Sequence, residues 1–140
     1  MELYLRPCTR NDWDTILDLR NQFYLESFVL QDRPLTKMEH YEYMENQLSN
    51  PNFHQWMGIM NNDVVGYIRI LELEINILVL KKYQNKGVGT KMLELLENEA
   101  MKLNIKKLRA SVRVDNLSSK QLFQKNNYKL KMYLFEKSFE

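Results

Sequence analysis

The stretch from Ile75 to Ala100 constrains the fold of this chain most strongly, because its apolar pattern changes there from strand to helix. The segment INILVL is followed by a polar loop and then by the amphipathic segment VGTKMLELLENEA. The chain has only four glycines, and two of them, Gly87 and Gly89, lie at this change. Glycine removes the Cβ atoms that would hold a ligand off the backbone, and the first N–H groups of a helix have no partner within it. The stretch therefore predicts a pocket for a pyrophosphate, with a tight turn that binds nothing as the alternative.

Length, charge and cysteine content narrow the class of protein. A chain of 140 residues with 44% hydrophobic and 27% charged residues has the composition of a globular protein, and we expect residues 1–140 to form a single domain. A net charge of +2 does not predict binding to nucleic acid or to an anionic membrane surface, so we expect a small-molecule partner. The single cysteine, Cys8, excludes an internal disulfide and a Cys-rich metal site. Without a signal peptide pattern or an apolar run of membrane-spanning length, we expect a cytoplasmic protein. Because the chain has one cysteine and two histidines that lie far apart in the sequence, we expect no metal site.

Apolar periodicity predicts the order of the elements. Alternation predicts strands at 2–6, 53–60, 64–71, about 73–80, 105–114 and 128–135. Helical spacing and capping sequences predict a helix that ends near residue 24, a helix between 36 and 50, and helices at 88–103 and 117–126, with a loop or broken helix at 25–35. Strand, two helices, three strands, helix, strand, helix, strand is an α/β order, and it predicts a mixed sheet with helices on both faces.

The loop before the third predicted helix resembles a known family motif. Gln84-Asn85-Lys86-Gly87-Val88-Gly89 after Ile77-Leu78-Val79 resembles the acyl-CoA-binding motif of the GNAT N-acetyltransferase superfamily, Gln/Arg-x-x-Gly-x-Gly/Ala after a strand. A Walker loop and a dinucleotide fingerprint are both excluded, because Gly-Lys-Ser/Thr and the third glycine are missing. The order of the predicted elements also resembles the GNAT fold over essentially the whole chain.

The resemblance implies a binding site for acetyl-CoA. It places the pantetheine arm along Ile77, Leu78 and Val79, with the Val79 N–H polarising the thioester carbonyl. Such a donor is worth roughly 3 kcal/mol when it meets a developing oxyanion. The pyrophosphate is implied to lie on the loop and the start of the helix, at Gln84, Asn85, Lys86, Gly87, Val88, Gly89 and Thr90.

A second GNAT segment follows further along the chain. The family pattern is Asn-x-x-Ala/Ser, with Tyr four residues later and Gly-Phe after three more, and here it reads Asn116-Leu117-Ser118-Ser119, Phe123 and Asn127-Tyr128. By resemblance Asn116, Ser119 and Phe123 contact the coenzyme, although Asn before a helix is also a plain N-cap. Phe123 departs from the family, which usually has a tyrosine there to protonate the leaving thiolate. A thiol with a pKa near ~8.5 can leave without a dedicated acid.

The chemistry also requires a base. An amine with a pKa of ~10.4 costs about 4 to 5 kcal/mol to deprotonate at pH 7, and only the neutral amine attacks. Resemblance points to Glu74 as this catalytic base, because several family members have Glu-Ile ten residues before the loop glutamine. Glu72 is the second candidate for the base. A solvated carboxylate at a hairpin turn explains Glu74 equally well.

A short pattern suggests the acceptor. Thr36-Lys37-Met38-Glu39-His40, together with Leu19-Arg20-Asn21, resembles a GNAT subgroup that acetylates amino groups of nucleotide-activated sugars, and this implies that His40 binds the substrate. The methionines and tyrosines between 23 and 44 would suit an acceptor pocket, a homodimer interface or ordinary core packing, and core packing is the commoner use. A homodimer is one of the expectations from the sequence.

These residues predict an acetyl-CoA-dependent N-acetyltransferase that acts on a primary amine of a small molecule by direct attack. A UDP-linked amino sugar is the first acceptor, and polyamines or protein N-termini are the second, because the loop also resembles that of spermidine and ribosomal-protein acetyltransferases. The alternative from another class is a module that binds acyl-CoA without turnover, for which Phe123 would be the sign.

Overall fold

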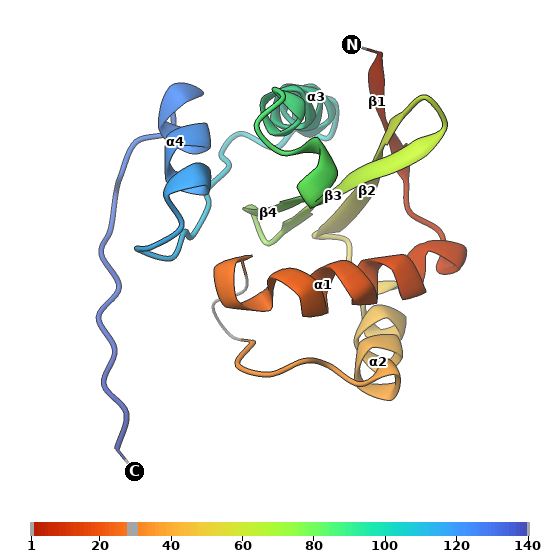
Figure 1. Cartoon of the computed structure of the whole chain (residues 1–140), viewed down its shortest axis with the longest axis horizontal. Helices are drawn as coiled ribbons and strands as arrows, with labels where there is room; N and C mark the ends of the chain where they lie inside the picture. The colour runs from red at the N-terminus through yellow and green to blue at the C-terminus, as the bar shows by residue number, and fades with distance from the viewer. Residues whose placement is uncertain (1, 28–30, 140) are drawn as a thin grey trace.

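A four-stranded antiparallel sheet lies between two layers of helices (Figure 1). The computed structural model describes residues 2–27 and 31–139. Its strands lie side by side in chain order, as β1 (Leu3–Pro7), β2 (Phe53–Met60), β3 (Asp63–Leu71) and β4 (Glu74–Val79). Its helices are α1 (Trp13–Ser27), α2 (Lys37–Gln47), α3 (Val88–Lys102) and α4 (Leu117–Lys125), with short 3₁₀ turns η1 (Arg10–Asp12) and η2 (Lys81–Tyr83). This arrangement confirms the predicted mixed α/β class.

Two apolar layers hold the helices on the sheet. On β4, Ile75 and Ile77 pack into the cluster that contains Met92 of α3, whereas Leu78 packs into the cluster that contains Trp13 of α1. Successive side chains of a strand point to opposite faces, so both faces of this sheet are buried. Helix α3 therefore covers one face, while α1 and α2 cover the other (Figure 1).

Both hairpins turn through two residues in the left-handed region. Asn61 and Asn62, with φ of 53° and 65°, join β2 to β3, as the Asn-Asn-Asp sequence predicts. Glu72 and Leu73, with φ of 49° and 73°, join β3 to β4. A branched, apolar leucine in this conformation costs roughly 1–2 kcal/mol, and the ladder from Leu71 to Glu74 holds it there.

The element order differs from the prediction after α3. Of the predicted strand at 105–114, the structure forms a single parallel bridge between Arg109 and Glu74. The predicted last strand, 128–135, has no pairing partner among the described residues, and the chain there runs out as an extended segment (Figure 1). Both segments have the apolar alternation of a strand, but a strand also requires hydrogen bonds to a neighbour along its length, and neither segment forms such a ladder with the described residues.

The remaining differences lie around the first helix. Helix α1 continues to Ser27, so it enters the region 25–35 where a loop or broken helix is predicted. Residues 28–30 of that region lie outside the described residues. In the described part of the chain no helix is both long and apolar enough to cross a membrane.

Candidate acetyl-CoA site

The site begins where β4 separates from the segment after α3. The Ile75 N–H donates to the Arg109 carbonyl at 2.8 Å, and the Arg109 N–H donates to the Leu73 carbonyl at 3.0 Å. A regular parallel ladder would continue from Ile77 to Ser111, but the bridge at Arg109 is isolated. The two segments therefore meet at the start of β4 and open a slot toward its end.

The backbone of β4 points two N–H groups into this slot. Residues of an edge strand alternate between its two neighbours, and the Leu80 N–H donates to the Val65 carbonyl on β3 at 3.0 Å. The even-numbered residues of β4 therefore face β3, and the odd-numbered ones face outward, as the bond from Ile75 to Arg109 shows. By this alternation the N–H groups of Ile77 and Val79 point into the slot.

Helix α4 closes the slot into a pocket. Its lining comes from β4, from the segment after α3 and from α4, as Ile75, Asn76, Ile77, Ser111, Val112, Asn116, Ser119 and Phe123. Four residues predicted to bind the coenzyme, Ile77, Asn116, Ser119 and Phe123, thus meet in one place. Leu78 is 2% exposed, its side chain packs on the opposite face, toward α1, and its backbone faces β3, so its predicted contact with the coenzyme stays a prediction.

The sequence analysis missed four lining residues, Ile75, Asn76, Ser111 and Val112. The alternating pattern of 108–114 was the available signal, because it predicts a strand beside β4. The pattern does not say that this strand leaves its neighbour after one bridge.

The glycine loop lies at the far end of the slot. The Gln84 side chain donates from Nε2 to the Val79 carbonyl at 2.9 Å, which ties the loop to the end of β4. Gly87 is the N-cap of α3 with φ of 79°, a left-handed conformation that glycine adopts without strain. Asn85, at φ of 61°, is the other left-handed residue of the loop. The loop therefore turns sharply and presents the start of α3.

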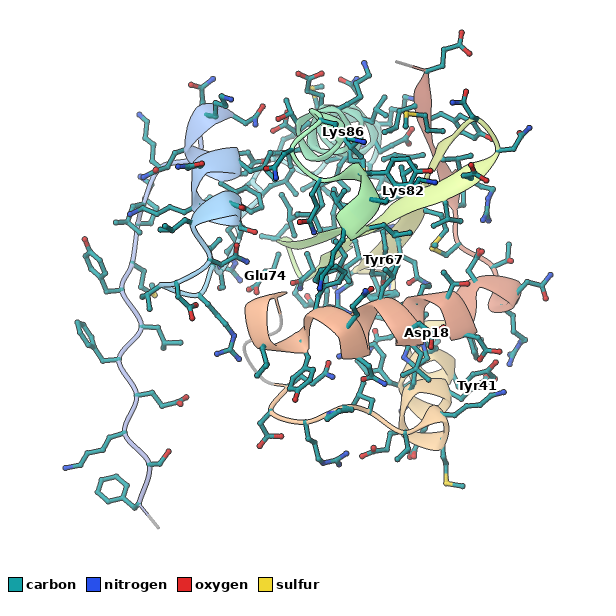
Figure 2. All side chains as sticks on the ribbon, in the orientation of Figure 1. Asp18, Tyr41, Tyr67, Glu74, Lys82 and Lys86 are labelled. Carbon is teal, nitrogen blue, oxygen red and sulfur yellow. The ribbon has the colours of Figure 1, made fainter. Side chains whose placement is uncertain are left out.

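The charges around the start of α3 suit an anion. The first turn of this helix carries no acidic residue, and Lys81, Lys82 and Lys86 are exposed in the preceding turn and loop. Figure 2 shows Lys82 and Lys86 near the start of α3. Backbone N–H groups, the positive end of the helix dipole and nearby lysines together favour a pyrophosphate.

The structure leaves enough space at Gly89 for a Cβ atom. A Cβ built on Gly89 would lie 3.6 Å from Leu122 Cδ2 of α4 and 3.8 Å from Val79 Cγ2 of β4, which are ordinary contacts. Its φ lies outside the left-handed region. A side chain at 89 would thus point into the space between α3, β4 and α4, where the coenzyme is predicted to pass.

The rings of Phe123 and Tyr128 pack against each other beside the pocket. Phe123 is 7% exposed and its ring meets that of Tyr128 edge to face, with centroids 5.2 Å apart. The Tyr128 hydroxyl donates to Glu97 Oε2 on α3 at 2.8 Å, and burial, together with this bond, raises the pKa of Tyr128. Because Tyr128 is held by Glu97 and does not line the pocket, it does not replace the missing tyrosine at 123 as an acid.

Glu74 lies on the opposite face of the sheet from the glycine loop. It is half-buried at the start of β4, and the alternation that turns Ile75 and Ile77 toward α3 turns Glu74 toward α1. Figure 2 shows Glu74 on the side of the sheet that α1 covers. The role of Glu74 as a base stays a prediction.

His40 is fully buried at 0% exposure, between α2 and α1. Its Nε2 lies 2.9 Å from the Trp13 carbonyl oxygen, so the ring ties the two helices together. Burial lowers the pKa of His40, and a neutral ring is therefore favoured. A direct contact between His40 and a substrate stays a prediction, and it would require this packing to open.

Comparisons with known proteins test the family to which the chain belongs. The model of the family described as "Acetyltransferase (GNAT) family" matches residues 13–128, which is most of the chain. The chain belongs to the GNAT acetyltransferase family. As a member of this family it is an N-acetyltransferase that uses acetyl-CoA as co-substrate, as the two sequence segments predict.

Solved structures share the fold of this GNAT chain. Spermidine N-acetyltransferase from Vibrio cholerae in complex with CoA and spermine has a TM-score of 0.84 and 20% identity, covering 98% of this chain and 86% of that chain. An N-acetyltransferase from Staphylococcus aureus Mu50 has a TM-score of 0.76 and 23% identity, covering 92% and 84%. A "predicted acetyltransferase with acetyl-CoA" from Clostridium acetobutylicum has a TM-score of 0.73 and 18% identity, covering 98% and 96%. At these identities the likeness establishes the GNAT fold and leaves the acceptor open.

Proposed function

We propose that this GNAT enzyme transfers the acetyl group of acetyl-CoA to a primary amine of a small anionic molecule, with a UDP-linked amino sugar as the first acceptor to test. The observation that carries the proposal is the slot between β4 and residues 109–112, with the glycine loop at one end and Glu74 at the other. We further propose that residues 1–140 act as a single cytoplasmic domain and that the enzyme is a homodimer.

The direction of the slot supports one orientation of the coenzyme. If the pyrophosphate lies at Gly89, the neighbouring Val79 lies at the start of the pantetheine arm, because a Cβ at Gly89 would be 3.8 Å from Val79 Cγ2. The thioester is at the other end of that arm and would lie further toward Ile77. Both N–H groups face the slot, and Ile77 also lines the pocket with Asn116 and Phe123. This placement favours the Ile77 N–H over the Val79 N–H as the group that polarises the carbonyl.

The reaction then proceeds by direct attack. The neutral amine nitrogen forms a bond to the thioester carbonyl carbon, the C–S bond breaks, and the thiolate leaves with the electron pair. Glu74 begins β4 and lies three residues from Ile77, which is about 10 Å along a strand. The proton of the amine would therefore reach Glu74 through bridging water. The thiolate then takes a proton from solvent, since Phe123 has none to give.

Two buried arginines lie beside Tyr43. Arg20 and Arg69 are 9% and 7% exposed, and their guanidinium carbons lie 5.2 and 5.9 Å from the centroid of the Tyr43 ring. Burial and the nearby Arg69 lower the pKa of Arg20. Arg69 is also the register partner of Asn76, which lines the slot. Both arginines have interaction partners within the fold, so the proposal of a nucleotide-linked acceptor rests on the resemblance of Thr36-Lys37-Met38-Glu39-His40 to the amino-sugar subgroup.

The test is the release of free thiol from acetyl-CoA across a panel of amines. The panel contains UDP-linked amino sugars, the same amino sugars without the nucleotide, spermidine and peptide amines. The proposal expects turnover with the nucleotide sugar, and at least tenfold lower kcat/KM with the sugar alone. Turnover only with spermidine or with peptides would refute the anionic acceptor. Binding of acetyl-CoA without turnover on any amine would instead support an acyl-CoA-binding module.

A further inference from the structure

The chain between α3 and α4 carries positive charge next to the acetyl-CoA slot. Residues 105–114 contain no acidic residue and four cationic ones, Lys106, Lys107, Arg109 and Arg113. The segment lies between α3 and α4 (Figure 1), and it meets β4 at one bridge, between Arg109 and Glu74. The slot opens from this bridge, so Arg109 lies at the end of the site where Glu74 begins β4. The coenzyme assignment does not use this charge.

The side chain of Arg109 lies on the face of the sheet toward α1. Its even-numbered neighbours pack into the apolar cluster of α3 on the other face, as Leu108, Ala110 and Val112. The bridge leads to the same assignment, because the two residues of a parallel bridge place their side chains on one face, and Glu74 faces α1. Arg109 and Glu74 are therefore neighbours on that face, on segments about 4.8 Å apart.

Glu74 and Arg109 are oppositely charged neighbours that do not pair with each other. Among the residues that the structure describes, no ion pair joins the two side chains, and the Arg109 side chain donates no hydrogen bond. Arg109 is exposed, whereas Glu74 is half-buried. The guanidinium is therefore accessible to a ligand, with the carboxylate of the candidate base beside it.

We propose that Arg109 binds a phosphate group of the acceptor while Glu74 receives the proton of its amine. The inference rests on the proposed function, since it takes acetyl transfer near Ile77 and Glu74 as given. An acceptor held by both residues carries an amine and, a few bonds away, an anionic group. A nucleotide-linked amino sugar has this composition. Spermidine would instead place a second ammonium group beside Arg109, where like charges repel.

The guanidinium of Arg109 suits a phosphate in shape as well as in charge. Its N–H donors form a planar fork that binds two phosphate oxygens at once, and it is more weakly hydrated than an ammonium group. Lys107, two residues earlier, lies on the same face by the alternation of the segment, and it is also exposed. Both charges therefore lie at the same edge of the site. Because salt screens exposed charges, their effect should be larger at low ionic strength.

Binding of UDP tests the phosphate site without turnover. The chain is first saturated with coenzyme A, which occupies the glycine loop, and UDP is then titrated by calorimetry. Arg109→Gln removes the charge, so the Kd for UDP should rise about 10- to 100-fold. Arg109→Lys keeps the charge without the fork and should recover part of the affinity. Lys125→Gln, exposed on α4, is the matched control and should change the Kd less than about twofold.

These substitutions leave the fold intact, because the side chains that they change are exposed. Thermal unfolding should therefore give the melting temperature of the natural chain for all three variants. A natural chain that binds no UDP, or an Arg109→Gln variant with the Kd of the natural chain, would overturn the phosphate site.

Turnover distinguishes this inference from the proposed function. Arg109→Gln should lower kcat/KM for the nucleotide sugar by about 10- to 100-fold, mainly through KM, and should change it less than about twofold for the same sugar without the nucleotide. Equal losses on the two sugars would overturn the role of Arg109 and leave the proposed acetyl transfer standing. Weaker UDP binding by Arg109→Gln, with no turnover of any anionic amine by the natural chain, would support the phosphate site and refute the proposed acceptor.

Discussion

Two glycines two positions apart should respond to alanine in opposite directions. Gly89 lies in the first turn of α3, and a Cβ there would meet its nearest atoms at 3.6–3.9 Å without a clash. Alanine is the better helix former by about 0.5–1 kcal/mol, so Gly89→Ala should raise the free energy of unfolding by up to that amount. For a chain of this size the melting temperature should rise by roughly 2–5 °C.

Gly87→Ala is the matched control. Gly87 has φ of 79°, where an alanine Cβ meets backbone strain of roughly 1–2 kcal/mol. Its melting temperature should therefore fall by several degrees. Thermal unfolding followed by circular dichroism distinguishes the two variants directly.

The same Gly89→Ala variant should bind acetyl-CoA more weakly despite its greater stability. The added methyl group occupies the space between α3, β4 and α4 and holds the pyrophosphate off the first N–H groups of the helix. A hydrogen bond to a charged group is worth about 1.5–3 kcal/mol, so the Kd should rise by about 10- to 150-fold. Isothermal titration calorimetry measures this. An unchanged Kd in a stably folded Gly89→Ala variant would refute the placement of the pyrophosphate.

Three further predictions concern other parts of the molecule. Burial lowers the pKa of His40 below its unfolded value near 6.5, so the unfolded chain takes up the proton first, and stability is lost as pH falls below about 6.5. In urea unfolding at pH 7.5 and 5.5, His40→Asn should be less stable at both values but should lose less on acidification than the natural chain; equal losses would contradict a buried neutral ring. Glu74→Gln should lower kcat/KM by about 10²- to 10⁴-fold while Glu72→Gln, in the exposed turn, changes it less than about twofold, and similar activities would exclude Glu74 as the base. Phe123→Tyr should change kcat by less than about threefold, because a thiolate leaves without an acid; a tenfold gain would reveal a missing acid.

The glycine loop shows how far the sequence predicted the site. Gly87 and Gly89 look alike in the sequence, which predicts that both contact the pyrophosphate. The structure distinguishes the two positions. The left-handed backbone at 87 requires a glycine, whereas a Cβ at 89 would make only ordinary contacts. A sequence motif does not specify the backbone angles of a glycine or the free space beside it.

The turn before β4 could be placed only approximately. Glu72 and Leu73 are poor residues for a two-residue hairpin, and local preference gives no signal there. The ladder between β3 and β4 imposes the turn from outside, and it thereby decides that Glu74 starts β4 on the face toward α1. The position of Glu74, the candidate base, thus depends on the pairing of β3 with β4, which local sequence preferences do not predict.

By itself the sequence determined the types of most elements and the glycine turn that begins α3, because apolar periods and glycine positions act within a few residues of one another. Only the tertiary structure determined the position and shape of the slot. Its shape depends on Arg109 pairing with the start of β4 and on the chain then diverging, which is a balance between segments far apart in the sequence. The predicted last strand, 128–135, shows the same division: the alternation of Leu130, Met132 and Leu134 specifies a strand, but a strand is completed by a neighbour, and the positions of neighbours are set by the packing of the whole molecule.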